Sequence, residues 1–396
     1  MRVTIALAAV AWLVAVAGCA VTGWPLAIYR DGDFFAFWAG SRSLFEGRDP
    51  YDLAWWTAIH AREGSAELTF LWPLSGPQWP SVYPLWTDLV FLPVAIVPIG
   101  FGAAVWLVSQ VMAVLAVVVV LWRLILGHAR TSLLLVIAIV TGSYPFWLLI
   151  VGGNMTGWLF AIYWGAVGLA LTERYASAGA IIGLVLLKPQ ALLVAVPAAL
   201  ATLPRQRLRA ALAGLAVATA LFVTTIVLRP AWIGEWLSSL AIARTVPLSN
   251  STVWTLDRAI GQVPWIGPAM AIGLGLATFW WVARSRPSWL WVVCASTALS
   301  VAVAPYGWSY DELLLLPVAL PIIAVTSGWR TAERVAMLLA TAVVLDVLPW
   351  ILHAVALRRG GEELNAFVPV LALGLVVLAH AHPRSGPRSA MRRALR

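Results

Sequence analysis

The chain has 396 residues, of which 62% are hydrophobic and only 11% are charged. A soluble globular domain carries about 25% charged residues, so this composition excludes that class. Several apolar runs reach the roughly 20 residues that a helix needs to cross a ~30 Å hydrocarbon layer. The sequence therefore predicts an all-α polytopic membrane protein.

The net charge of +9 does not indicate nucleic-acid binding, because five arginines lie in an acid-free C-terminal tail, 383–396. Positive charge at that place favours a cytoplasmic location and contact with anionic lipid. The two cysteines, Cys19 and Cys294, lie in apolar runs without metal-ligand spacing. No phosphate-binding loop, dinucleotide fingerprint or nucleophile elbow occurs. We therefore expect neither a metal nor a cofactor.

The first apolar run has two interpretations. Residues 1–19 resemble a cleaved signal, and Val16-Ala-Gly-Cys19 resembles a lipoprotein cleavage site. However, only Arg2 precedes the run, which continues to Gly23 and is long for a signal. We expect the run to be kept as the first membrane helix.

Apolar runs separated by polar or Pro/Gly breaks predict about twelve transmembrane helices. They lie near 3–23, 83–99, 102–123, 131–150, 154–172, 177–203, 208–228, 266–283, 288–303, 311–326, 331–352 and 366–382. We expect one membrane domain over 1–382, followed by the basic tail.

Arginine positions favour one orientation of these helices. An even number of spans puts both termini on the same side, together with Arg205–Arg209, Arg284/Arg286 and Arg330/Arg334. Basic loops face the cytoplasm, so that side is predicted to be cytoplasmic. The loops 24–82, 229–265 and 303–310 are then external. Two arginine pairs favour the opposite orientation, Arg123/Arg130 and Arg358/Arg359.

The first external loop, 24–82, gathers seven of the 17 carboxylates: Asp31, Asp33, Glu46, Asp49, Asp52, Glu63 and Glu67. Apolar residues from Phe34 to Phe45 follow helical spacing and predict an amphipathic interfacial helix that stops at Gly47. Asp52 is placed to cap a second short helix that ends near Arg62. The loop 229–252 holds Trp232, Trp236 and Leu240 at helical spacing and predicts another interfacial helix. A membrane protein with its acids in one loop is expected to do its chemistry there.

Asp33 has two interpretations from the residues alone. As a carboxylate beside the membrane it is a candidate general base for an acceptor hydroxyl. As a structural group it would cap the helix that begins at Phe34. Asp31 precedes Gly32 and fits a turn, so it is the weaker catalytic candidate.

Lys188 is the only lysine of the chain and lies in the middle of the predicted span 177–203. Pro189 removes a backbone donor and breaks the helix beside it. A buried cation on a broken membrane helix is costly and usually functional, so Lys188 is a candidate phosphate contact. The alternative is a structural pair with Asp346 or Asp311. Tyr306, Tyr310 and Asp311 lie together at a span end, where an aromatic belt is the alternative to a substrate pocket.

These motifs together resemble glycosyltransferase family 87 of the glycosyltransferase C superfamily, relatives of polyprenyl-phosphate-mannose-dependent mannosyltransferases. The resemblance rests on Asp33-Phe-Phe-x-Phe-Trp-Ala-Gly, Pro50-Tyr-Asp52, Tyr83-Pro84, Gly153-Asn154, Leu187-Lys-Pro-Gln190 and Pro305-Tyr…Tyr310-Asp311. It covers nearly three quarters of the chain. The family often has Gly-Gln-Asn where this chain reads Gly152-Gly-Asn154, and Tyr-Pro-Pro where it reads Tyr83-Pro-Leu.

The resemblance implies a bacterial plasma-membrane enzyme that moves a sugar from a polyprenyl-phosphate donor to a lipid- or glycan-linked acceptor hydroxyl. An acid in the first external loop of such enzymes sits at the active site, which maps onto Asp33. The implied donor-phosphate contacts are Lys188, Gln190, Arg229 and Arg244, and the implied pocket residues are Asn154, Tyr83, Tyr306, Tyr310 and Asp311.

Two other classes remain open from the sequence. A transporter or lipid flippase also explains a lysine on a broken membrane helix. The C-terminal half, however, shows no second break of that kind, and a transporter needs no acid-rich first loop. A non-catalytic scaffold for envelope assembly would leave both Lys188 and the loop unexplained.

Overall fold

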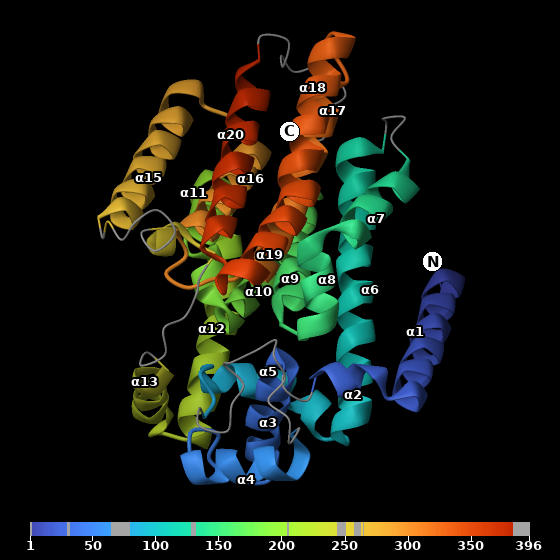
Figure 1. The fold of residues 1–396 in the computed structure, drawn as a ribbon, viewed down its shortest axis with the longest axis vertical. Helices are drawn as coiled ribbons and strands as arrows, with labels where there is room; N and C mark the ends of the chain where they lie inside the picture. The colour runs from blue at the N-terminus through green and yellow to red at the C-terminus, as the bar shows by residue number, and fades with distance from the viewer. Residues whose placement is uncertain are drawn as a thin grey trace. The chain divides into compact units, whose positions relative to one another are not determined.

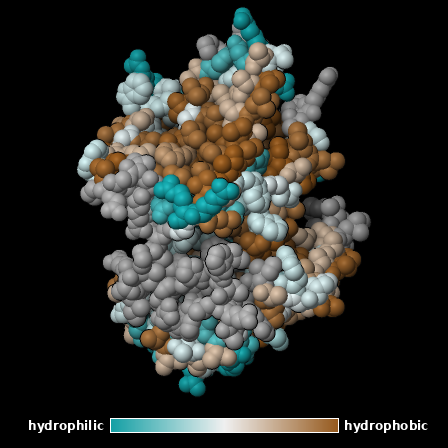
Figure 2. All heavy atoms as spheres, in the orientation of Figure 1, coloured by the Kyte–Doolittle hydropathy of each residue, from teal (hydrophilic) through white to brown (hydrophobic). Residues whose placement is uncertain are grey.

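A computed structural model of the chain describes residues 2–29, 32–64, 80–127, 132–203, 206–243, 251–256, 263 and 265–382. Every regular element within these ranges is a helix, as Figure 1 shows. The all-α prediction is therefore confirmed. Figure 2 shows hydrophobic residues over much of the visible described surface, as expected of a protein that lies in lipid.

The chain forms two compact units. The first comprises Met1–Val114, Leu148–Trp158 and Ala218–Pro247; the second comprises Leu115–Trp147, Leu159–Val217 and Leu248–Arg396. The expectation of one membrane domain over 1–382 stays a prediction. We describe each unit by itself.

Unit 1 is built largely from the N-terminal third of the chain. Its helices are α1 (Arg2–Thr22), α2 (Trp24–Tyr29), α3 (Asp33–Phe45), α4 (Leu53–Glu63), α5 (Leu85–Ala95), the first part of α6 (Ile99–Leu126) and α13 (Trp232–Ala243). It also holds most of α8 (Tyr144–Gly152), the start of α9 (Thr156–Leu171) and the end of α12 (Arg207–Leu228).

Aromatic side chains form the centre of unit 1. The ring of Trp106 lies 5.4 Å from that of Phe37 and 5.5 Å from that of Phe34, and Phe91 meets it edge-on at 4.7 Å. Tyr83 packs against Phe37 at 4.5 Å. Offset and edge-to-face aromatic pairs of this kind stabilise a core beyond their buried area. The cluster therefore joins α3, α5 and α6 into one body.

Unit 2 holds the remaining helices. They are α7 (Leu133–Gly142), α10 (Tyr175–Ile182), η1 (Gly183–Leu187), η2 (Pro189–Leu192), α11 (Ala195–Thr202), η3 (Val253–Thr255), α15 (Ile266–Ser285), α16 (Trp289–Val303), η4 (Ser309–Val318), α17 (Ala319–Thr326), α18 (Thr331–Ala342), η5 (Val343–Val347), α19 (Leu348–Arg359), η6 (Glu363–Ala366) and α20 (Phe367–Ala381). The helix α16 is buried from Leu290 to Ala302 and packs against α11, α15 and α20. A helix that is apolar on all sides belongs at the centre, and α16 lies there.

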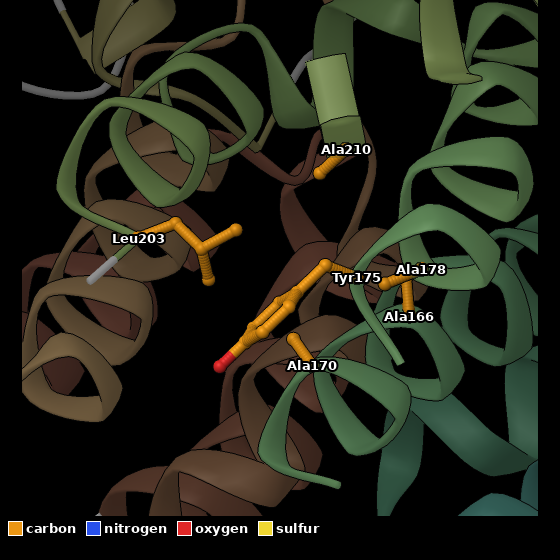
Figure 3. Close-up of a cluster of buried hydrophobic side chains, with 6 residues drawn as sticks. All are labelled: Ala166, Ala170, Tyr175, Ala178, Leu203 and Ala210. Atoms are coloured by element: carbon orange, nitrogen blue, oxygen red, sulfur yellow. The ribbon is translucent and has the colours of Figure 1, made fainter. Parts of the chain in front are cut away.

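Small side chains line an apolar cavity of about 40 Å³ in unit 2. Figure 3 shows the buried cluster beside it, in which Tyr175 is surrounded by five residues that also line the cavity: Ala166, Ala170, Ala178, Leu203 and Ala210. Because alanine side chains are small, α9, α10 and α12 can approach closely here. The space that larger side chains would fill remains as the cavity.

The membrane character of the chain agrees with the prediction, but the number of spans is smaller by a strict test. Six helical segments within the described residues are long and apolar enough to cross a membrane: Ile99–Leu126, Arg207–Leu228, Ile266–Ser285, Ser309–Thr326, Thr331–Arg359 and Glu363–Ala381. A seventh arises if Leu133–Gly142 and Tyr144–Gly152, which bend by 59°, count as one span. Each of the twelve predicted runs falls on a helix or a broken helix. The count of twelve remains a prediction.

The predicted span 83–99 illustrates the difference. Its helix, α5, has 11 residues, and Pro98 lies before α6. At 1.5 Å per residue, α5 is about 16 Å long, which is roughly half of the hydrocarbon thickness. Two further predicted spans are broken. The span 177–203 breaks at Lys188-Pro189, as the sequence indicated, and the span 131–150 breaks at Ser143, which the sequence did not indicate.

Candidate functional site

Asp33 is the first residue of α3 and does not occupy its cap. Gly32 precedes the helix in an extended conformation and accepts a hydrogen bond from the backbone N–H of Phe35 through its carbonyl oxygen. The Asp33 side chain is half-buried, and its Oδ2 accepts a hydrogen bond from Asn154 Nδ2 at 2.8 Å. The capping role that the sequence left open thus belongs to Gly32. An acid in the first turn is also stabilised by the helix dipole.

Asn154 lies fully buried in the turn between α8 and α9. Its Oδ1 accepts hydrogen bonds from the backbone N–H of Thr156 at 2.9 Å and from the Thr156 hydroxyl at 2.6 Å. Because Oδ1 is held by two donors, the amide nitrogen is the atom that faces Asp33. The amide therefore presents a donor to the carboxylate in a fixed direction.

Gly153 makes this turn possible. Its φ of +63° lies in the left-handed region, and a Cβ there would come within 2.7 Å of the Cβ of Phe34. Trp106 Nε1 donates a hydrogen bond of 2.8 Å to the Gly153 carbonyl oxygen. The turn is thus fixed to the aromatic cluster, and the first residues of α3 pack directly on it.

The helix α3 differs from the amphipathic interfacial helix that the sequence predicted. Its range is confirmed, but Phe34, Phe35 and the five residues 37–41 are all buried, so no broad face is left for water. The reason is its small residues. Gly40 faces the fully buried Asp88 of α5, and a side chain at position 40 would overlap that carboxyl group. The close approach of α5 therefore covers the face that was expected to be exposed.

The second loop helix is confirmed. The helix α4 runs from Leu53 to Glu63, and Asp52 Oδ1 accepts a hydrogen bond from the backbone N–H of Ala54 at 2.8 Å. The helix predicted around Trp232 is also present as α13, with Trp232 buried and Trp236 donating a hydrogen bond to the Val82 carbonyl oxygen at 3.0 Å.

Arg229 is held by two carboxylates in unit 1. Its guanidinium donates to Asp49 Oδ2 at 2.5 Å and to both oxygens of Glu235 at 2.5 and 2.8 Å. Partial burial raises the pKa of Asp49. The hydrogen bond from the Tyr51 backbone N–H and the charge of Arg229 lower this pKa, but by less. The hydrogen bonds that Arg229 donates to Glu235 raise the pKa of Arg229 against the effect of burial. The group is partly exposed, and it connects the loop after α3 to the start of α13.

Tyr83 contributes to unit 1 mainly through packing. Besides its contact with the Phe37 ring, its carbonyl oxygen accepts a hydrogen bond from the Tyr51 hydroxyl at 2.8 Å. The side chain is half-buried.

A second polar group lies in unit 2 around Lys188. The residue separates η1 from η2 with φ −148° and ψ 67°, so the backbone leaves the helical path there. The Lys188 side chain is 2% exposed, its ammonium pairs with Asp311 Oδ1, and it lies 4.4 Å from the centre of the Tyr310 ring. The structure thus shows the pair with Asp311, which the sequence gave as the alternative to a phosphate contact. Gln190 follows in η2 and is half-buried.

Further acids surround this pair. Asp311 Oδ2 accepts a hydrogen bond from the Trp308 backbone N–H at 3.3 Å, and Glu312 beside it is also buried. Glu362 Oε2 accepts from the Ser309 hydroxyl at 2.7 Å; burial raises the pKa of Glu362, and the bonds from Ser309 offset part of that rise. Tyr306 is half-buried and accepts a hydrogen bond from Trp308 Nε1 at 2.6 Å.

The predicted residues therefore form two groups, one in each unit. Unit 1 brings together Asp33 and Asn154 and holds Tyr83 and Arg229; unit 2 brings together Lys188, Tyr310 and Asp311 and holds Gln190 and Tyr306. Asp31 and Arg244 lie outside the described residues. Among the residues that the structure describes, no group of three His, Cys, Asp or Glu side chains could hold a metal ion.

Sequence reasoning missed three residues at these groups. Thr156 orients Asn154, and Trp106 fixes the turn before it. Glu362 joins the unit 2 acids from a site more than 50 residues along the chain. Position 156 had a signal, because an Asn side chain often accepts a hydrogen bond from the backbone N–H two residues later in the chain. A tryptophan in an apolar run and a glutamate in a polar connection carry no such signal.

Comparison with known proteins adds one finding. The model of glycosyltransferase family 87 matches residues 82–309, which is more than half of the chain. The chain belongs to glycosyltransferase family 87. No curated protein and no solved structure matches it. Family membership makes this chain a membrane glycosyltransferase, and it does not favour the transporter that composition and Lys188 left open.

Proposed function

We propose that this family 87 enzyme moves a sugar, mannose or another hexose or pentose, from a polyprenyl-phosphate donor to a hydroxyl of a lipid- or glycan-linked acceptor. Transfer takes place at the external face of a bacterial plasma membrane. Family membership supports the glycosyltransferase reaction, and the apolar helices support a donor that is held in lipid. The identity of the donor, the identity of the acceptor and the membrane face on which transfer takes place are our proposals.

The observation that carries the proposal is the setting of Asp33. Its carboxylate is half-buried, does not occupy the helix cap and is oriented by a fixed amide. A general base needs this combination, because it must be held in one direction and still be reached by a proton donor. Among the other described carboxylates of the acid-rich loop, Glu46 and Glu63 accept hydrogen bonds from arginine side chains, and Asp52 accepts one from a backbone N–H.

The proposed step balances with one base. The acceptor hydroxyl oxygen forms a bond to the anomeric carbon, while the bond from that carbon to the phosphate oxygen breaks. Polyprenyl phosphate leaves with the electron pair, and the hydroxyl proton passes to the Asp33 carboxylate. A phosphate is already a stable anion, so the leaving group needs no separate acid.

The donor-phosphate role of Lys188, Gln190, Arg229 and Arg244 is a further part of the proposal. Two of these cations have carboxylate partners, Asp311 for Lys188 and both Asp49 and Glu235 for Arg229. A phosphate would have to compete with those partners. Asp33 therefore has the stronger support.

The test compares Asp33→Asn with Asp31→Asn in purified protein given radiolabelled polyprenyl-phosphate mannose, glucose and a pentose, with membrane lipid extract as acceptor. Asparagine keeps the size of the side chain but cannot take a proton, so Asp33→Asn should lower turnover by about 10²–10⁴-fold. Asp31→Asn should keep most activity. Full activity of Asp33→Asn would remove Asp33 from the chemistry, and loss in Asp31→Asn alone would move the role to Asp31.

A further inference from the structure

Asn154 uses its two side-chain atoms for different partners: its oxygen bonds Thr156 and its nitrogen bonds Asp33. Asn154 has no exposed surface, and its oxygen is occupied by both the backbone N–H and the hydroxyl of Thr156. Its nitrogen meets Asp33 Oδ2 at 2.8 Å. A side chain that is fully buried and bonded at both ends is poorly placed to contact a sugar directly.

We infer that Asn154 is a positioning residue for Asp33: it acts through the carboxylate and does not bind substrate. The inference rests on the proposed role of Asp33 as base, and it replaces our expectation that Asn154 lines the substrate pocket. Thr156 is part of the same device, because it sets which end of the amide faces the acid.

Geometry gives the amide two effects on the acid. A hydrogen bond to one carboxylate oxygen, Oδ2, restricts the rotation of the group and so holds the carboxylate in a constant direction. A donor to the carboxylate also favours its ionised form, which is the form that can accept a proton. Both effects need the N–H of the amide, and neither needs contact with the sugar.

The backbone before Asn154 is held in a defined conformation. Gly153 takes a left-handed conformation, and its carbonyl oxygen accepts a hydrogen bond from Trp106. A residue with φ of this sign costs nothing at glycine and is strained elsewhere. The turn therefore delivers a rigid amide to the first residue of α3.

The decisive variant is Asn154→Asp. It keeps the size of the side chain and an acceptor for Thr156, but it puts an oxygen where Nδ2 stood, next to the Asp33 carboxylate. Two carboxyls at that spacing resist ionising together. We expect the acid limb of the pH–rate profile to move to higher pH by more than about one unit. Turnover at neutral pH should fall roughly tenfold or more, with a smaller change in KM.

Two further variants grade the effect. Asn154→Ala removes the donor without adding charge, so its acid limb should move up by about one unit, the size of a lost charge-assisted hydrogen bond. Thr156→Val keeps the shape and the backbone donor but removes the hydroxyl, so its acid limb should move to higher pH by less than that of Asn154→Ala. Thr156→Ser keeps the hydroxyl, so its acid limb should move by less than that of Thr156→Val.

Asn365→Ala is the matched control, since Asn365 is equally buried but lies in unit 2. It should leave the acid limb in place even if it lowers stability. A readout without turnover separates this inference from the proposed function. The infrared carboxylate band that Asp33→Asn removes can be titrated in the protein and again in the Asn154→Ala background. Its midpoint should rise by about one pH unit in that background.

The outcomes are distinct. If Asp33→Asn is inactive while the Asn154 variants keep the wild-type acid limb and infrared midpoint, the positioning role is wrong and the proposed function stands. A rise in KM with an unmoved limb would make Asn154 a substrate contact and overturn the inference. If Asp33→Asn stays active but the infrared midpoint shifts, Asn154 still tunes the acid and the proposed role of Asp33 as base fails.

Discussion

Lys188 is the residue whose environment most changes its interpretation. The sequence shows a lone lysine on a broken apolar helix, and the structure shows that its ammonium is bonded to Asp311 and lies over Tyr310. A buried pair costs desolvation on both sides, and breaking it leaves one charge without compensation. The pair therefore has a stability role whether or not a donor phosphate competes with Asp311 for Lys188.

A double-mutant cycle at this pair separates the two roles. Lys188→Met keeps the length of the side chain and leaves Asp311 without its partner, which should destabilise the protein by about 3–5 kcal/mol. Lys188→Met combined with Asp311→Leu removes both charges and should recover most of that loss, as thermal unfolding in detergent can measure. If the double variant is stable and still turns over donor at the wild-type rate, Lys188 is structural and not a phosphate contact.

At the residue scale, the sequence indicated single chemistry-bearing groups but did not settle their partners: Asp311 was one of two candidates for Lys188, and no partner was assigned to Asp33. Lys188 stands out because a lysine inside an apolar run is costly without a reason, and Asp33 stands out because it lies in the acid-rich loop next to an apolar helix. Their partners Asn154 and Asp311 lie more than 100 residues away along the chain. Such pairs depend on how the helices pack, which local spacing does not encode.

Helix boundaries followed local rules, but helix environments did not. The predicted ranges of α3 and α4 and the presence of a helix at Trp232 are confirmed, because caps, glycines and apolar spacing act within a few residues. The burial of α3 on nearly all sides was not predicted, since it depends on Gly40 meeting Asp88 of another helix. The effect of small residues in one helix therefore depends on which other helix packs against them.

The contact between α10 and α12 within unit 2 is of this kind. Gly179 and Gly183 are four residues apart, and so are Ala210 and Gly214 on the facing helix. A Cβ at Gly179 would overlap the Ala210 carbonyl oxygen, and one at Gly183 would come within 2.6 Å of the Gly214 carbonyl oxygen. Small residues at this spacing let membrane helices approach until their backbones touch.

We expect Gly179→Ala to destabilise the protein by about 1–3 kcal/mol, because the methyl group has no room beside the backbone of α12. Gly273→Ala on α15 is the control, since nothing lies within 4 Å of its added methyl group and alanine favours helix. Thermal unfolding of both variants in the same detergent checks this. Equal stability of the two would show that the close contact is absent in the membrane protein.

At the scale of the whole molecule, hydropathy predicted the class, and family membership agrees with the enzyme that the motifs resembled. The number of membrane crossings is harder to predict than the class, because the hydropathy of an apolar run does not show where its helix breaks. The runs 177–203 and 131–150 both contain a break, and 83–99 yields a helix of 11 residues. Proline, serine and a buried lysine interrupt these runs, so hydropathy over a window overstates the length of the helices.

The helix α5 decides the orientation of most of the chain. If the segment 83–98 crosses the membrane, twelve spans put Arg205–Arg209 and the tail in the cytoplasm and residue Gly127 outside. If it does not cross and the later spans do, everything from α6 to the C-terminal tail changes side, so Gly127 becomes cytoplasmic and both Arg205–Arg209 and the tail become external. The second arrangement accounts for Arg123 and Arg130, but it places Arg205, Arg207, Arg209 and the basic tail on the unfavourable side. We therefore expect reporter fusions after Arg209 and after the tail to read cytoplasmic, and fusions at Ser65 and Gly127 to read external. A fusion at Gly127 that reads cytoplasmic would mean that α5 does not cross, and a cytoplasmic Ser65 would remove Asp33 from the external face.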